Sequence, residues 1–230
     1  MNNSGTATSF TAILPIKFNS ERVPGKNFRD FLGLPLYLHI IKNLLEVQPI
    51  TKIVINTDAP MSEFDHKIDD PRIEFSKRPE YLLGETVSMN SIIEYEINRT
   101  GDDLFFMTHT TNPLLSSSTI HRMLQVYNLE NSNNDSVVSV SKFFGRFLDI
   151  QGHPLNHNPV SLLRTQDLEP VLFENSCGYV FSKQSFSNTK SRIGFNPLFF
   201  ETPKLESVDI DEEDDWKIAE ALAEYGKRNV

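Results

Sequence analysis

Leu14-Pro15-Ile16-Lys17-Phe18-Asn19-Ser20-Glu21-Arg22-Val23-Pro24-Gly25-Lys26-Asn27 is the stretch of sequence that decides the fold. It follows an apolar run at residues 10–16, which predicts a buried strand, and precedes residues 31–47, which predict a helix. A loop between a strand and a helix lies at the carboxyl end of the strand, where open α/β sheets bind ligands. A polyphosphate site is therefore predicted on this loop. Its donors are Lys17, Ser20, Arg22, Lys26, Asn27 and Arg29.

The length of the chain fits one large α/β domain or two small ones, and its composition supports a real core. The 230 residues are 39% hydrophobic and include 17 Phe. A net charge of −9 and a pI of about 5.2 argue against binding nucleic acid or membranes through bulk charge, so a local basic cluster must hold any anionic substrate. The one cysteine, Cys177, excludes an intrachain disulfide. No run approaches the ~18 apolar residues of a membrane span. With no signal-like pattern in residues 1–9, we expect a cytoplasmic protein.

Strand-like and helix-like segments alternate along the chain, without an internal repeat or a linker. This alternation favours a three-layer α/β/α fold with a mostly parallel central sheet and one domain over residues 1–230. Strands are predicted at residues 10–16, 51–56, 73–75, 104–107, 136–141, 177–181, 195–201 and 205–209. Helices are predicted at residues 36–47, 61–68, 88–99, 118–129 and 211–227.

The alternation breaks between residues 143 and 173. Glycines and prolines divide this segment into short aromatic and polar pieces. A connection of this length inside a compact domain is rarely plain loop. We therefore expect short antiparallel strands that project from the sheet.

The opening loop carries a resemblance to a known family. Seven of its residues stand at the spacing of the signature of the cytidylyltransferases that activate acidic sugars: Pro15, Lys17, Ser20, Pro24, Gly25, Lys26 and Asn27. These are the CMP-N-acylneuraminate synthetases and their relatives acting on other nonulosonic acids and on 3-deoxy-manno-octulosonate. The simpler alternative is a polar surface loop in which Pro24-Gly25 makes a turn. The resemblance spans residues 11 to about 225. It implies a nucleotide-diphospho-sugar transferase-like fold and a homodimer, with residues 143–173 as dimer contact and lid.

The reaction that the resemblance implies is transfer of CMP from CTP to the anomeric hydroxyl of an acidic sugar, with release of pyrophosphate. Lys26, Lys17 and Arg22 are the candidates for neutralising the phosphates. Arg78, in an Arg-Pro-Glu segment similar to one in the family, is expected to reach the nucleotide. The complete set of expected nucleotide-binding residues is Lys17, Ser20, Arg22, Lys26, Asn27, Arg78 and Ser88.

Asp209-Ile210-Asp211 is a candidate metal site. Residues two apart on a strand point to one face, and two carboxylates on one face suit a hard divalent ion that also binds substrate phosphates. The alternative is that the acidic run only caps the following helix and complements its dipole. The run resembles the D-x-D-x-E-x-D-W segment of the family, whose aspartates hold Mg²⁺. The resemblance thus implies Mg²⁺ on Asp209 and Asp211. A structural zinc site is improbable, because the six histidines show no HxH or HExxH spacing and only one cysteine is present.

The expected sugar site also rests on the resemblance. His109 follows a predicted strand and stands where the family has a glutamine that touches the sugar acid; a satisfied strand-end histidine is the plain alternative. Asn175 belongs to a segment similar to the turn beside the sugar, and a paired aromatic echoes one that walls the sugar pocket. The expected substrate-binding residues are His109, Thr111, Asn112, Asn175, Phe199 and Phe200.

Two departures from the family pattern leave the acceptor open. Lys17 stands where an arginine is common, which keeps the charge but loses the bidentate fork. Glu21 places a carboxylate where the sialic-acid branch has a lysine. Two other functions stay open: a metal-dependent glycosyltransferase, and a catalytically silent nucleotide-sugar-binding protein.

Overall fold

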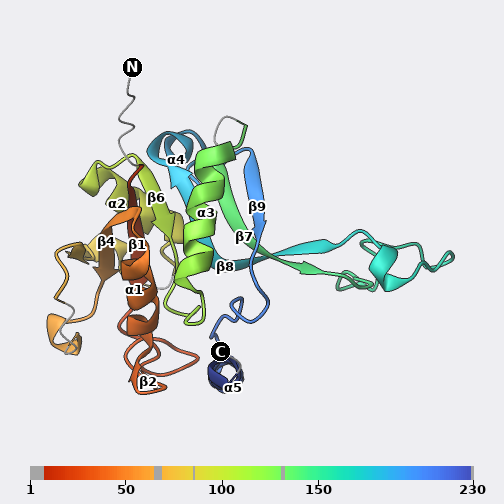
Figure 1. Cartoon of the computed structure of the whole chain (residues 1–230), viewed down its shortest axis with the longest axis horizontal. Coiled ribbons are helices and arrows are strands. Elements are labelled where there is room, and N and C mark those ends of the chain that lie inside the picture. Colours follow the sequence, from red (N-terminus) through yellow and green to blue (C-terminus); the bar gives the residue numbers. More distant parts are fainter. Residues whose placement is uncertain (1–7, 65–68, 85, 131–132, 229–230) are drawn as a thin grey trace.

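The computed structural model describes residues 8–64, 69–84, 86–130 and 133–228. Within this part, one sheet is built from β1 (Phe10–Ile16), β4 (Ile50–Thr57), β5 (Ile73–Lys77), β6 (Leu104–Met107), β7 (Ser136–Phe143), β8 (Val171–Ser182) and β9 (Pro197–Glu201). The strand order is β5-β4-β1-β6-β8-β7-β9. The first four strands run parallel, β8 is antiparallel to both neighbours, and β9 is parallel to β7. The predicted mostly parallel sheet is confirmed (Figure 1).

Strand β1 lies inside the sheet because both of its faces are apolar. All seven of its residues are buried. Successive side chains point to opposite faces, so Leu14 packs with α1 (Leu36–Glu46) and α3 (Ser117–Glu130), whereas Ile13 packs with α2 (Met89–Thr100) and α4 (Lys183–Thr189). Figure 1 shows α1 and α3 across one face of the sheet. The expected three layers are therefore present.

Two caps fix where helices begin. The Ser88 hydroxyl accepts a hydrogen bond from the backbone N–H of Ser91 at the start of α2, and the Ser116 hydroxyl accepts one from Thr119 at the start of α3. Gly101 ends α2 in the left-handed conformation. Of the helix predicted at residues 61–68, the structure describes one 3₁₀ turn, η1 (Met61–Glu63), and residues 65–68 lie outside the described part. A second such turn is η2 (Glu80–Leu82).

Two local predictions are wrong. Residues 31–35 are not helical: β2 (Asp30–Phe31) and β3 (Leu34–Pro35) form a small antiparallel pair around a left-handed turn at Gly33 (φ 91°), and Pro35 precedes α1. Residues 205–209 are not a strand, because they turn after Pro203 and do not pair with the sheet. The last helix, α5 (Glu213–Arg228), starts two residues after its predicted start at residue 211.

Helix α5 packs against the loop that follows β1. Trp216 and Ala219 of α5 form a buried cluster with Val23 and Phe31, and Ile210 completes it from the chain just before the helix. Arg29 lies 4.3 Å above the centre of the Trp216 ring. The loop after β1 and the C-terminal part of the described chain thus form one small core beside the carboxyl ends of the strands.

Residues 143–173, where the alternation of elements breaks, project from the body of the molecule (Figure 1). Strands β7 and β8 continue past the sheet as an antiparallel ribbon, with Phe143 opposite Val171 (Figure 1). The expected short strands reduce to one bridge, between Leu148 and Pro154, and one 3₁₀ turn, η3 (Thr165–Asp167). Most of the pairing comes from the two sheet strands themselves. No helix in the described part of the chain has the length and apolar character needed to cross a membrane.

Gly178 of β8 provides a test of the packing between β6 and β8. A Cβ there would lie 2.7 Å from the Phe106 ring and 3.3 Å from the Met123 methyl group. We expect Gly178→Ala to lower the free energy of unfolding by about 1–3 kcal/mol, measured by urea denaturation. Gly226→Ala in α5, where nothing lies within 4 Å of the added carbon, is the control and should be neutral or stabilising. Equal stability of Gly178→Ala and the wild type would contradict the close approach.

Candidate functional site

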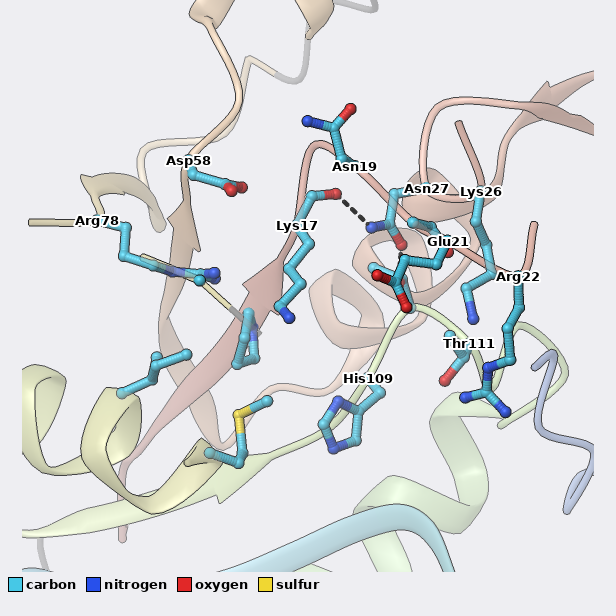
Figure 2. Close-up of a pocket in the computed structure, with 16 residues that line it drawn as sticks. Lys17, Asn19, Glu21, Arg22, Lys26, Asn27, Asp58, Arg78, His109 and Thr111 are labelled. Atoms are coloured by element: carbon cyan, nitrogen blue, oxygen red, sulfur yellow. Dashed lines mark hydrogen bonds between the residues drawn. The ribbon is translucent and has the colours of Figure 1, made fainter. Parts of the chain in front are cut away.

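A cavity of about 640 Å³ opens at the carboxyl ends of β1, β4 and β6. Chain segments distant in sequence meet there because the carboxyl ends of parallel strands share one edge of the sheet. Figure 2 shows cationic side chains entering from the loop after β1 and from the end of β5. The lining consists of Pro15, Lys17, Asn19, Ser20, Glu21, Arg22, Lys26, Asn27, Asp58, Arg78, Gly84, Met89, Ile92, His109, Thr110 and Thr111.

Asn27 braces the loop that carries the cations. Its buried amide donates to the Lys17 carbonyl oxygen at 2.6 Å, and its amide oxygen accepts from the Thr110 hydroxyl (Figure 2). Asp58, just past the end of β4, accepts from the Phe18 backbone N–H at 2.7 Å. The loop is thereby tied to itself and to two neighbouring strand ends. Lys17 and Arg22 stay exposed, with their charges at the cavity.

Lys26 joins this loop to the acidic pair near the end of the chain. Its ammonium group donates to the Ile210 carbonyl oxygen at 2.6 Å and lies 3.5 Å from Asp211 Oδ1. Arg22 donates to the same Asp211 oxygen at 2.8 Å. The backbone N–H of Ile210 in turn donates to the Thr111 carbonyl oxygen. Two cations and two aspartates separated by more than 180 residues therefore form one cluster.

Asp209 has an unsatisfied oxygen within this cluster. Its Oδ1 atom is buried and has no hydrogen-bond partner. Burial raises the pKa of Asp209, the Thr111 hydroxyl opposes that rise, and neighbouring Asp211 adds to it. A buried, unpaired carboxylate oxygen is costly unless something compensates its charge. Two carboxylates suit a hard divalent ion that takes its remaining ligands from substrate phosphates and water. No group of three or more acidic, histidine or cysteine side chains fit for a metal occurs among the described residues.

Arg78 is buried at the opposite side of the cavity. Its Nε atom donates to Asn56 Oδ1 at 2.7 Å, and the Asn56 amide donates to the fully buried Glu96 carboxylate at 2.6 Å. Burial lowers the pKa of Arg78, against the opposing effects of Asp58 and Glu96. This chain of bonds uses one edge of the guanidinium and leaves the other for the cavity, where Arg78 belongs to the lining.

His109 lines the cavity between β6 and the loop cations. Burial, with the positive charges of Arg192 and Lys26, lowers the pKa of His109 to about 3. Its Nε2 atom lies 3.4 Å from Arg192 NH1. The ring is therefore neutral at ordinary pH.

Several predicted site residues lie outside this cavity. Ser88 caps α2, and Asn112 is fully buried and donates to the Val208 carbonyl oxygen. The Asn175 amide donates to the hydroxyls of Ser141 and Thr202 and is likewise buried. Phe199 and Phe200 lie on edge strand β9. The structure brings together Lys17, Ser20, Arg22, Lys26, Asn27, Arg78, His109 and Thr111, with Asp209 and Asp211 adjoining them through Lys26.

Sequence reasoning missed Asp58, Glu96 and Arg192. Asp58 had a signal, because it follows a predicted strand next to the opening loop. Glu96 occupies the inward face of a predicted helix, where a lone acidic residue among Ile92, Ile93 and Ile97 marks a buried polar contact. Arg192 had none, since 83 positions separate it from the histidine it contacts.

Comparisons with known proteins show which family this chain is similar to. The cytidylyltransferase family profile matches residues 11–225. The CMP-N,N'-diacetyllegionaminic acid synthase of Legionella pneumophila is 27% identical over 94% of the chain and 97% of its own length. An N-acylneuraminate cytidylyltransferase of Streptococcus agalactiae is 25% identical over 89% of the chain, which spans 51% of that relative. Among solved structures, a CMP:2-keto-3-deoxy-manno-octonic acid synthetase complexed with CTP has a TM-score of 0.65 at 16% identity, covering 95% of this chain and 99% of its own. That last likeness concerns the fold.

The neutral state of His109 predicts a pH dependence of stability. Its folded pKa, about 3, is below the ordinary value of 6.5. At pH values between these two pKa values, the unfolded chain binds a proton at His109 that the folded chain does not. The contribution of neutral His109 to the stability of the folded state is therefore complete above about pH 6.5 and is lost as the pH falls toward 3. From pH 8 to pH 5 we expect the wild type to lose about 1–2 kcal/mol more unfolding free energy than His109→Gln, measured by urea denaturation. Parallel stability curves would contradict the depressed pKa; comparing these two proteins cancels the other titrating groups.

Proposed function

The chain belongs to the cytidylyltransferase family, and from this we propose that it transfers CMP from CTP to the anomeric hydroxyl of an acidic sugar, releasing pyrophosphate and forming a CMP-activated sugar. One observation carries the proposal: Lys26, which lines the cavity, joins the cationic loop after β1 to the adjoining Asp209–Asp211 segment. Phosphoryl chemistry requires cations for the phosphate oxygens and a fixed line between the attacking and leaving oxygens.

We assign the phosphate contacts to Lys26, Lys17 and Arg22, with Ser20 as a further donor. Lys26 is the best placed, because its bond to the Ile210 carbonyl aims the ammonium at the cluster and its burial strengthens the charge. Arg22 shares an Asp211 oxygen with Lys26, and triphosphate would compete with that carboxylate for both cations. Glu21 also lines the cavity, so these positive charges must outweigh a carboxylate beside them.

We propose Mg²⁺ as the metal, held by Asp209 and Asp211. The unpaired Asp209 oxygen and the chemistry of two carboxylates beside a phosphate site support this assignment. A bound divalent ion would neutralise phosphate charge and lower the pKa of the attacking hydroxyl. The chain's own part is to hold the two carboxylates: the Lys26 ammonium donates to the Ile210 carbonyl oxygen, and the Ile210 backbone N–H donates to the Thr111 carbonyl oxygen.

We assign the nucleoside end to Arg78 and Asn27 and the acceptor end to His109 and Thr111. Arg78 presents a free guanidinium edge from a buried network, which suits a base or a ribose. His109 contacts Arg192, and the Thr111 hydroxyl interacts with Asp209. For Ser88, Asn112 and Asn175 we propose structural roles instead, because each lies outside the cavity lining and is bonded within the fold. Of their polar atoms, Asn112 Oδ1 is buried without a hydrogen-bond partner.

We propose that the projecting ribbon makes a homodimer and that residues 1–230 form one catalytic domain. The ribbon and its loops expose apolar side chains that the chain itself does not cover: Phe143, Phe144, Leu148, Ile150, Leu155, Val160, Leu162, Leu163 and Phe173. Exposed apolar patches of this kind mark protein–protein contacts. A cytoplasmic site of action, where CTP is available, completes the proposal.

Pyrophosphate release tests the function. The purified chain is incubated with CTP, Mg²⁺ and a panel of acidic sugars that includes N,N'-diacetyllegionaminic acid, N-acetylneuraminic acid and 3-deoxy-manno-octulosonic acid. We expect release with at least one acceptor, dependent on CTP. Tight CTP binding without release on any acceptor would instead identify a silent binding protein. Transfer from a preformed nucleotide sugar would identify a glycosyltransferase.

Lys26→Met tests the phosphate assignment. The substitution keeps the buried aliphatic stem and removes the charge. We expect turnover to fall by about 100-fold or more, because one preorganised cation at a transferring phosphate contributes on that scale. Lys217→Met, on the exposed face of α5, is the matched control and should turn over normally. Near-normal turnover by Lys26→Met would refute the assigned role.

Asp209→Asn tests the metal assignment without relying on turnover. We expect Mg²⁺ to raise the thermal midpoint of the CTP-bound wild type and to have no such effect on Asp209→Asn. Asp214→Asn, whose carboxylate pairs with Lys217 on the surface, should respond to Mg²⁺ as the wild type does. An equal Mg²⁺ shift in Asp209→Asn would overturn the assignment.

A further inference from the structure

We propose that Arg192 is a positioning residue that fixes the tautomer of His109, so that the ring presents Nδ1–H into the cavity as an obligate donor to an oxygen of the acceptor sugar. The sugar part of this inference rests on the proposed function, whereas the tautomer does not. Arg192, which lies behind the wall of the cavity, thereby influences the choice of acceptor.

Arg192 is the donor and His109 the acceptor in the hydrogen bond between the two side chains. Arg192 NH1 lies 3.4 Å from His109 Nε2. A guanidinium has only donors, so Nε2 must offer its lone pair. A neutral imidazole carries one ring proton, and that proton is then on Nδ1. Burial together with the charges of Arg192 and Lys26 keeps the ring neutral, which excludes the doubly protonated form.

Arg192 is itself held in place by Tyr179 and Glu174. Its guanidinium carbon lies 3.9 Å from the centre of the Tyr179 ring, and its NH2 atom is 3.3 Å from Glu174 Oε1. The Tyr179 hydroxyl donates to the same Glu174 oxygen. Only 16% of the Arg192 side chain is exposed. Stacking on the ring and pairing with the carboxylate fix the plane of the guanidinium, and NH1 is thereby directed at His109.

The other ring nitrogen of His109 faces the cavity. His109 belongs to the cavity lining, whereas Arg192 does not. Figure 2 shows the His109 ring below Lys17, with one nitrogen directed toward the interior of the cavity. Since Nε2 is the nitrogen bound to Arg192, the nitrogen that faces the cavity is Nδ1.

The consequence concerns the acceptor. A glutamine at this position could present either its oxygen or its amide to a substrate. The Arg192-locked His109 can only donate, so it favours a carboxylate or carbonyl oxygen and leaves a substrate N–H or O–H donor without a partner. An unpaired buried group is costly, so a one-way contact of this kind discriminates between acceptors.

The tautomer is tested by ¹⁵N NMR of the ring nitrogens of His109 in the full chain, assigned with His109→Gln. We expect protonated Nδ1 and unprotonated Nε2 in the wild type and in Arg192→Lys. We expect a shift toward protonated Nε2 in Arg192→Met. Arg122→Met is the matched control, since Arg122 also stacks on an aromatic ring, Phe200, outside the cavity. Protonated Nε2 in the wild type, or no change in Arg192→Met, would overturn the proposal whether or not the chain has activity.

The acceptor contact is tested by kinetics with the panel acid that turns over fastest. When His109 is replaced by Asn, the side-chain amide occupies the position of the ring atom Nδ1. When it is replaced by Gln, the amide occupies the position of Nε2. We expect His109→Asn to keep the KM for the acceptor within about threefold and Arg192→Met to raise it about tenfold, with the KM for CTP unchanged in both. Arg192→Lys should recover part of the loss. Wild-type acceptor KM in Arg192→Met, or a greater rise in His109→Asn than in His109→Gln, would overturn the inference and leave the proposed cytidylyl transfer standing.

Discussion

The bond from the Lys26 ammonium to the Ile210 carbonyl is the contact on which the site depends. It spans 2.6 Å in space and 184 positions in sequence. The chain around it has little regular structure: a loop on one side and an unpaired segment before α5 on the other. Lys26 and Thr111 together hold that segment from two sides, and Trp216 anchors the helix that follows. Together with the Arg22–Asp211 ion pair, these bonds fix the aspartates relative to the loop after β1.

An acidic chain that binds anions must concentrate its positive charge. With a net charge of −9, the surface as a whole repels a triphosphate. The cavity opposes that field with two buried cations, Arg78 and Lys26, beside the exposed Lys17 and Arg22. Arg78 is held by an amide rather than directly by a carboxylate, and Lys26 is nearest to a carbonyl. Because burial makes each of these charges act through a low dielectric, a small number of them suffices.

Much of the fold could be predicted, because it follows from local patterns. Apolar runs such as residues 10–16 and 104–107 become the central strands, and the spacing of Ile92, Ile93 and Ile97 becomes the buried face of α2. The errors have local causes too: Gly33 and Pro35 interrupt an apolar segment that otherwise resembles helix. The cationic loop after β1 could also be predicted from local sequence, because its donors all lie between residues 17 and 29. What could not be predicted depends on contacts across the sheet, such as Arg192 with His109. Phe199 and Phe200, expected at the sugar site from the resemblance alone, lie on an outer strand and do not line the cavity.

The separation of Lys26 from Ile210 also orders events during synthesis. At about 5–20 residues per second, a ribosome reaches residue 210 roughly 10–40 s after Lys26. Strands β1, β4, β5 and β6 can assemble in that interval, because all of them precede the second half of the chain. The sheet edge and its cations thus exist before their acidic counterpart does. A nascent chain therefore passes through a stage with an exposed cationic loop, and the emergence of the last helix ends it.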